Sequence, residues 1–87
     1  MNKTIYKAEY QNFVKLLRTT REKRRLTQEQ LAQRLGKTQS FIGKCERGER
    51  RLDVIELRIF CMALDVELEH FISLLEVELA TVSSEVA

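Results

Sequence analysis

Residues 38–48 place polar and basic side chains at a spacing that would gather them on one side of a helix. The segment reads TQSFIGKCERG. At about 100° per residue, one arc of about 140° would hold Gln39, Ser40, Gly43, Lys44 and Arg47. The opposite side would hold three apolar residues and one acid, namely Phe41, Ile42, Cys45 and Glu46. The segment therefore predicts a helix that is buried on one side and exposes hydrogen-bonding groups on the other.

The exposed side of this helix has the groups that recognise the edges of nucleic-acid bases. The amide of Gln39 can pair with adenine, and the ammonium group of Lys44 can donate hydrogen bonds to guanine. Gly43 lies in the middle of this side, although a glycine inside a helix costs about 1 kcal/mol relative to alanine. Close approach of the helix to a partner would explain this glycine, and a tolerated imperfection is the alternative.

Two more helices are predicted before this segment. The first runs from about Thr4 to Arg24, because an apolar stripe at i, i+4, i+7 and i+11 is typical of a helix. The stripe consists of Tyr6, Tyr10, Phe13 and Leu17. The second begins after Thr27, since Thr27 and Gln30 have the T-x-x-Q spacing of a capping box. Gly36 stands where a helix end favours a residue with positive φ.

Capping residues also mark the remaining helices. Thr38 can cap the third helix and Asp53 the fourth, and a fifth helix begins near Glu67. Residues 80–87 are predicted to form a frayed C-terminal tail. The chain has 87 residues, no proline and three glycines. Few helix breakers and short connections predict an all-α fold, with a single domain over residues 1–79.

The distribution of charge divides the chain into two parts. The net charge is only +2. Residues 15–51 contain twelve Lys or Arg against four Glu, a net charge of +8. Residues 52–87 contain one Arg against eight acidic residues, a net charge of −7. A basic block beside an acidic block favours one face that meets a polyanion and another that is kept away from it. An incidental basic surface is the alternative.

The sequence argues against several other classes of protein. Cys45 and Cys61 lie sixteen positions apart and His70 is the single histidine, so we expect no metal site, which would need about four such ligands. We find no nucleophile–base pair or carboxylate dyad, and we expect neither an enzyme nor a cofactor. No apolar run approaches the ~18 residues of a membrane span. The N-terminus lacks the apolar segment of a signal peptide, so we expect a cytoplasmic protein without membrane contact.

The segment Leu26–Gly48, LTQEQLAQRLGKTQSFIGKCERG, resembles the helix-turn-helix of the phage repressor and Cro family, the Xre-type regulators. The matching pattern is T-Q-x-x-L-A-x-x-x-G, followed by Q-S-x-I and E-x-G. The helix-turn-helix itself would span about residues 27–48, and the resemblance extends over roughly residues 13–72. It implies a five-helix lambda-repressor-like DNA-binding domain, in which the second helix of the motif enters the major groove.

The resemblance implies roles for individual residues. Base contacts would come from Gln39, Ser40 and Lys44, with Phe41 as an apolar contact to a thymine methyl group. Phosphate contacts would come from Gln28, Thr38, Arg47, Arg50 and Arg51. Arg21 would pair with Glu46, which would explain an acid on the buried side of the third helix. The chain departs from the family pattern at Leu52, where proline is common, and at Asp65, where glycine is common.

The function that these observations predict is the regulation of transcription. The expected partner is double-stranded DNA with a palindromic operator, which a homodimer would occupy as a repressor in the cytoplasm of a bacterium or phage host, associated with the nucleoid. Leu74 and Val77 lie off the main stripe of the fifth helix and could form the dimer contact, unless the first helix covers them. The alternative function is an antitoxin-like or other protein-interaction module that neutralises a partner protein.

Overall fold

Short polar signals in the sequence determine where the helices begin and end. The computed structural model describes the backbone of residues 3–86 and the side chains of residues 7–81. Its helices are α1 (Lys3–Lys23), α2 (Gln28–Leu35), α3 (Gln39–Glu46), α4 (Val54–Ala63) and α5 (Leu68–Val86). Between residues 3 and 86 there is no strand. The predicted all-α fold with five helices is therefore confirmed.

Two capping boxes fix the starts of α2 and α4. The Thr27 hydroxyl accepts a hydrogen bond from the Gln30 amide at 3.0 Å, and the Gln30 side chain accepts one from the Thr27 amide at 2.9 Å. Asp53 and Glu56 form the same reciprocal pair, at 2.7 and 2.9 Å. Each pair satisfies amides that the first turn of a helix leaves without partners. Gly36 follows α2 with a φ of +66°, a conformation that suits a residue without a side chain.

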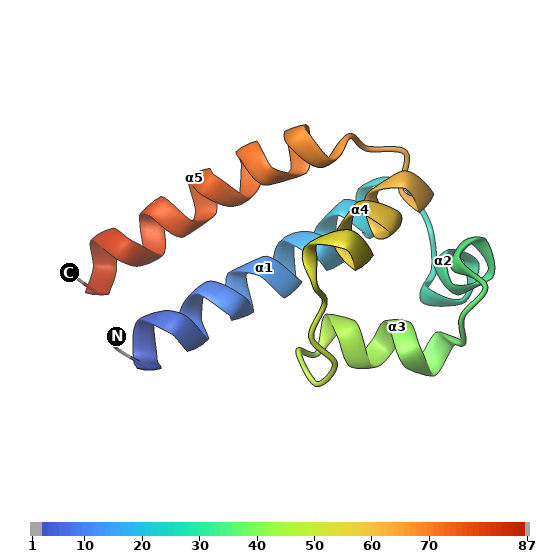
Figure 1. The fold of residues 1–87 in the computed structure, drawn as a ribbon, viewed down its shortest axis with the longest axis horizontal. Helices are drawn as coiled ribbons and strands as arrows, with labels where there is room; N and C mark the ends of the chain where they lie inside the picture. The colour runs from blue at the N-terminus through green and yellow to red at the C-terminus, as the bar shows by residue number, and fades with distance from the viewer. Residues whose placement is uncertain (1–2, 87) are drawn as a thin grey trace.

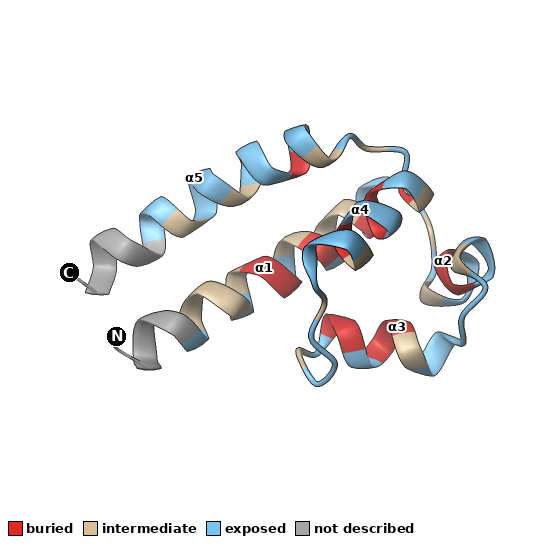
Figure 2. Cartoon of the chain, viewed as in Figure 1, coloured by how far each residue is buried: buried red, intermediate tan, exposed pale blue. Residues whose placement is uncertain are grey.

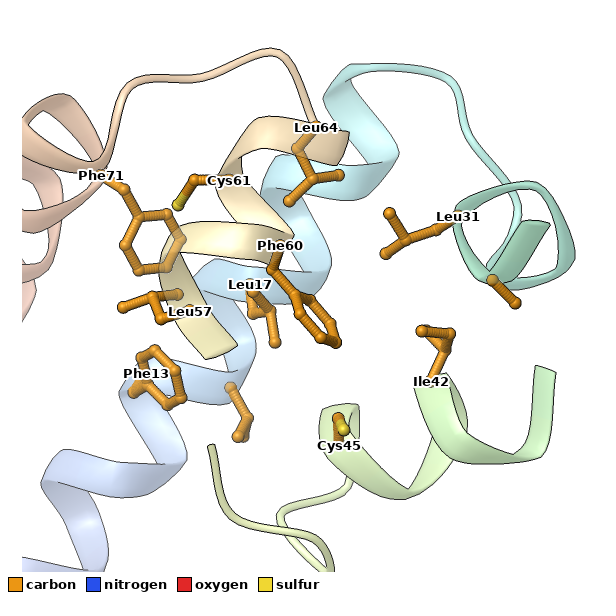
Figure 3. Close-up of a cluster of buried hydrophobic side chains, with 12 residues drawn as sticks. Phe13, Leu17, Leu31, Ile42, Cys45, Leu57, Phe60, Cys61, Leu64 and Phe71 are labelled. Carbon is orange, nitrogen blue, oxygen red and sulfur yellow. The ribbon is translucent and has the colours of Figure 1, made fainter. Parts of the chain in front are cut away.

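The two long helices, α1 and α5, run antiparallel and side by side, and the three shorter helices lie toward the C-terminal end of α1 (Figure 1). All five helices contribute to one apolar core (Figures 2 and 3). Its fully buried members include Leu17, Leu31, Ile42, Leu64 and Phe71. The edge of one ring meets the face of another between Phe13 and Phe71, with centroids 6.0 Å apart, which ties α1 to α5.

The C-terminal part of the fold differs from the prediction in its length. The sequence predicts a frayed tail over residues 80–87, but α5 is helical as far as Val86, and Ala87 lies outside the described residues. The serines and threonine of this segment have low helix propensity, yet no glycine or proline interrupts it. Among the described residues, no helix has the length and apolar character that crossing a bilayer requires.

Candidate nucleic-acid interface

The packing of α2 against α3 fixes the angle at which α3 is presented. Leu31 on α2 and Ile42 on α3 are both fully buried, and their side chains point into the same part of the core (Figure 3). Cys45 is buried one turn further along α3. Close-packed side chains of this kind resist rotation of one helix against the other. The outer side of α3 is therefore held in a constant orientation.

The outer side of α3 exposes most of the residues that the helical projection placed there. Gln39, Ser40, Lys44 and Arg47 are all exposed. Gly43 is buried, so the prediction that it lies open in the middle of this side is wrong. A Cβ atom added to Gly43 would lie 3.0 Å from Nη1 of Arg47, 3.6 Å from Oε1 of Gln28 and 3.6 Å from Nε2 of Gln39. These three side chains cover the glycine, and a projection of α3 alone cannot show that cover.

Gly43→Ala is expected to raise the free energy of unfolding by up to about 1 kcal/mol, because alanine favours a helix interior over glycine by that amount. The nearest group, at 3.0 Å, is the mobile end of the exposed Arg47 side chain, which can move aside. Urea denaturation followed by circular dichroism measures the change. Gly36→Ala is the control, and it is expected to destabilise the fold, because φ at this position is +66°. A Gly43→Ala variant less stable than the parent would show that the Arg47 side chain does not move aside.

A buried ion pair joins α1 to the end of α3. Nε of Arg21 donates to Oε2 of Glu46 at 2.6 Å, and Nη2 donates to Oε1 at 3.0 Å. Nη1 of Arg21 donates to the carbonyl of Leu26 at 2.7 Å. The structure thus brings together the two residues for which a pair is predicted, with side chains only 10% and 3% exposed. The hydrogen bond to Glu46 raises the pKa of Arg21 above its ordinary value, although burial opposes this.

The same carboxylate sets the orientation of two glutamines at the surface. Nε2 of Gln28 donates to Oε1 of Glu46 at 3.0 Å, and Nε2 of Gln39 donates to Oε1 of Gln28 at 2.5 Å. Because an ionised carboxylate can only accept, the amino group of Gln28 must face Glu46 and its carbonyl must face Gln39. Gln39 is left with its carbonyl oxygen and one N–H for a further partner. This donor and acceptor match the pair that the edge of adenine requires.

Phe41 is more engaged within the protein than a simple contact to a base would require. Its ring is half-buried and lies 6.3 Å from the ring of Phe60 on α4. Nζ of Lys37 lies 5.3 Å from the centre of the ring, and the guanidinium carbon of Arg50 lies 5.5 Å from it. Both distances are within the range of cation–π attraction. Phe41 therefore packs α3 against α4 and positions two cations at the surface.

The three arginines after α3 all have partners within the chain. Arg47 contacts Glu49 at 2.6 Å, and Arg50 contacts both carboxylate oxygens of Glu56, at 2.6 and 3.2 Å. These hydrogen bonds lower the pKa of Glu49 and that of Glu56 below their ordinary values. The guanidinium of Arg51 lies 4.2 Å from the centre of the Tyr10 ring. The positive charge of this segment is therefore partly neutralised by acids of the same chain.

Three features of this surface do not follow from the predictions made on the sequence. Glu49 follows Arg47 by two positions, so the adjacent opposite charges could have indicated that pair. The pairing of Arg50 with Glu56 depends on the path of the turn between α3 and α4, which no local pattern shows. Lys37 lies in the turn between α2 and α3 beside Phe41, and its position in the motif could have marked it.

Comparison with known proteins agrees with this arrangement. A helix-turn-helix family model matches residues 17–71. The chain is similar to a solved structure described as an XRE-family like protein from Pseudomonas syringae pv. tomato str. DC3000, with a TM-score of 0.80 and 45% sequence identity. That match covers 87% of this chain and 93% of the other. No curated protein matches the chain. On its motif, its fold and these similarities, the chain belongs to the Xre family of helix-turn-helix DNA-binding transcriptional regulators.

Proposed function

We propose that the protein binds a specific double-stranded DNA site and represses transcription by occupying an operator as a homodimer. The observation that carries this proposal is the fixed donor and acceptor of Gln39 at the exposed side of α3. The buried carboxylate of Glu46 holds Gln39 through Gln28, so the Gln39 side chain does not have to be ordered when it meets a base. Such preorganisation favours the discrimination of base pairs over simple attraction to phosphates.

In the proposed complex, α3 lies in the major groove. Gln39 pairs with an adenine edge, and Lys44 donates to a guanine. Ser40 can donate or accept on either kind of edge. Phe41 is proposed to reach a thymine methyl group with the part of its ring that remains exposed. These four residues supply the sequence information.

Phosphate contacts are proposed on both sides of the groove, from Gln28, Thr38, Arg47, Arg50 and Arg51. The Thr38 hydroxyl accepts a hydrogen bond from the Phe41 amide at 3.1 Å, which leaves its own proton free to be donated to a phosphate. To contact a phosphate, Arg47 and Arg50 must each release their carboxylate partner, or bind the carboxylate and the phosphate with the same guanidinium. The acids beside them reduce the gain from each phosphate contact, which limits attraction to DNA of any sequence.

Arg51→Ala is expected to weaken binding to every duplex alike and to lower the slope of log affinity against log salt by about one, because a phosphate contact carries no base information. Fluorescence anisotropy over a series of salt concentrations measures both effects. Arg58→Ala, an exposed arginine on α4, is the control with the same loss of charge. Equal slopes for the two variants would remove Arg51 from the phosphate contacts.

The proposed dimer contact uses the apolar residues that α5 leaves exposed. Val77 is 68% exposed and Leu74 is 40% exposed, although α5 packs along α1. The alternative that α1 covers these two residues within one chain is therefore not supported. A twofold axis near α5 would place two copies of α3 about 34 Å apart, which is one turn of DNA. A palindromic operator follows from that symmetry.

The experiment that tests this function is selection of bound sequences from a random duplex pool at about 150 mM salt, where non-specific attraction to phosphates is weakened. We expect enrichment of a palindrome whose half-sites are about one helical turn apart. A folded protein that enriches no sequence would contradict the proposed recognition of bases. Enrichment of a single half-site would retain base recognition and contradict the dimer.

A second candidate function is an antitoxin-like module that neutralises a partner protein. It is favoured by an apolar stripe on α4, where Ile55, Ile59 and Met62 follow one another at i, i+4 and i+7. Ile55 is 64% exposed and Met62 is 62% exposed. Exposed apolar faces of this kind often mark contacts with other proteins. Purification from the native host with a stoichiometric partner would support this function, and a partner-free protein that binds its operator would oppose it.

A further inference from the structure

We propose that one face of α1 forms a second contact with the DNA backbone, outside the helix-turn-helix. The face consists of Lys7, Gln11, Lys15 and Arg18, and we call it the α1 basic face. It would bind phosphates that flank the base pairs read by α3. The proposal rests on the proposed function, since it takes duplex DNA as the partner. It adds residues that the helix-turn-helix motif does not include.

The spacing of these four residues places them on one side of the helix. They stand at i, i+4, i+8 and i+11, so they fall within an arc of about 80° at about 100° per residue. All four are exposed. At a rise of about 1.5 Å per residue, the face is about 16 Å long. It is therefore long enough to meet more than one phosphate of a DNA strand.

The α1 basic face continues the surface of the helix-turn-helix. A hollow of about 420 Å³ lies at the starts of α2 and α3 and is lined by Arg21, Thr27, Gln28, Glu29 and Gln39. A second hollow of about 360 Å³ lies between α1 and the end of α3 and is lined by Gln11, Asn12, Val14, Lys15, Arg18 and Glu46. Each hollow includes one member of the Arg21–Glu46 pair, so the two hollows adjoin at that pair.

The turn that follows α3 also lies against this face. A Cβ atom added to Gly48 would lie 3.7 Å from Nε2 of Gln11. Figure 1 shows that the N-terminal half of α1 extends beyond the C-terminal end of α3. A duplex that meets α3 and the segment after it would thus pass next to Lys15 and Arg18. The face lies where the backbone of flanking DNA would be.

The cations of the α1 basic face differ from Arg47 and Arg50, because they have no acidic partner among the described residues. Among the described residues, neither Lys15 nor Arg18 takes part in an ion pair, whereas Arg47 and Arg50 both do. Like charges three residues apart on a helix disfavour it slightly. A polyanion would relieve this repulsion. The acid at the end of the face is Glu22, one turn beyond Arg18, so the basic character stops near the pair that holds α3.

The test compares two double variants. The first is Lys15→Gln with Arg18→Gln. The control is Lys23→Gln with Arg58→Gln, which removes two exposed cations elsewhere on the protein. Affinity is measured over a salt series for two duplexes. One holds the selected site alone, and the other adds about one helical turn of flanking DNA, roughly 10 base pairs, on each side. Thermal unfolding by circular dichroism confirms that both variants fold.

On the longer duplex, we expect the Lys15/Arg18 variant to lower the salt slope by about two relative to the control variant. The affinity would fall about 30-fold at about 150 mM salt, which follows from two lost phosphate contacts with a slope of about 0.9 each. On the shorter duplex the two variants should agree. Equal slopes for the two variants on the longer duplex would overturn the proposal.

This test distinguishes a failure of the α1 contact from a failure of the proposed function. Phosphate contacts do not depend on base sequence, so the same comparison can be made on a scrambled duplex of equal length. If the parent protein does not distinguish the selected duplex from the scrambled one, the proposed specific regulator fails. The lower salt slope of the Lys15/Arg18 variant can still be measured on the scrambled duplex. If the variant and the control have equal slopes there, the α1 contact is overturned, whatever the result for the proposed function.

Discussion

Replacing Glu46 with alanine is expected to lower the free energy of unfolding by about 3–5 kcal/mol, because it leaves the buried guanidinium of Arg21 without a counter-charge. The Arg21 side chain is only 10% exposed, so water would compensate only in part for the lost carboxylate. The amino group of Gln28 loses its acceptor at the same time. Urea denaturation followed by circular dichroism, with the slope against urea as a check on two-state unfolding, measures the loss.

The matched control for Glu46→Ala is a double variant, Arg21→Met with Glu46→Leu. Apolar residues of similar size in place of both partners are expected to recover most of the stability, since a buried pair is costly to break and contributes little net energy when intact. Both variants also remove the acceptor that orients Gln28 and, through it, Gln39. The double variant should therefore be stable and yet discriminate less well at the base pair that Gln39 is proposed to read. A Glu46→Ala variant that loses less than about 1 kcal/mol would show that the pair is effectively solvated.

Lys44→Ala is expected to weaken binding to the selected duplex by about 1–3 kcal/mol and to relax the preference at one base pair of each half-site. The Lys44 side chain is exposed on the outer side of α3, so its removal should not change the stability of the fold. Anisotropy with the selected duplex and all its single-base variants measures the effect position by position. Arg51→Ala is the comparison, because it should weaken binding at every position alike. If the two variants gave the same profile on all duplexes, Lys44 would not read a base.

The sequence predicts the fold well because each helix carries its own signals. Thr27 with Gln30, and Gly36 nine residues after Thr27, are local patterns, and the structure contains the capping box and the positive φ that they predict. Asp65 takes a φ of +57° at a helix end, as expected for a short polar residue that tolerates the left-handed conformation. Tertiary packing is not needed to place any of these residues.

The sequence predicts the exposed side of α3 only in part, because a helical projection treats the helix as isolated. It places Gln39, Ser40 and Lys44 correctly at the surface. It misses the burial of Gly43, since that burial comes from Gln28 on α2, Gln39 on α3 and Arg47 just after α3. Contacts of this kind depend on the angle between the helices.

Ion pairs between residues far apart in the sequence are also predicted only in part. The Arg21–Glu46 pair follows from the family resemblance and is present in the structure. The pair between Arg50 and Glu56 does not follow from any pattern, because it crosses the turn between α3 and α4. A sequence shows how many cations the basic segment contains, but it does not show how many of them are already paired with acids.

The proposed function requires α3 to read base edges in the major groove through Gln39 and Lys44. The most direct test replaces single purines of the selected duplex with 7-deaza analogues, in which a C–H group takes the place of the N7 acceptor of the major groove. Loss of N7 should weaken binding at a few adjacent positions in each half-site, because Gln39 and Lys44 would donate to this atom. At the position assigned to Lys44, the Lys44→Ala variant should show no further loss. Binding that is unchanged by every 7-deaza substitution would contradict the reading of bases by α3 in the major groove.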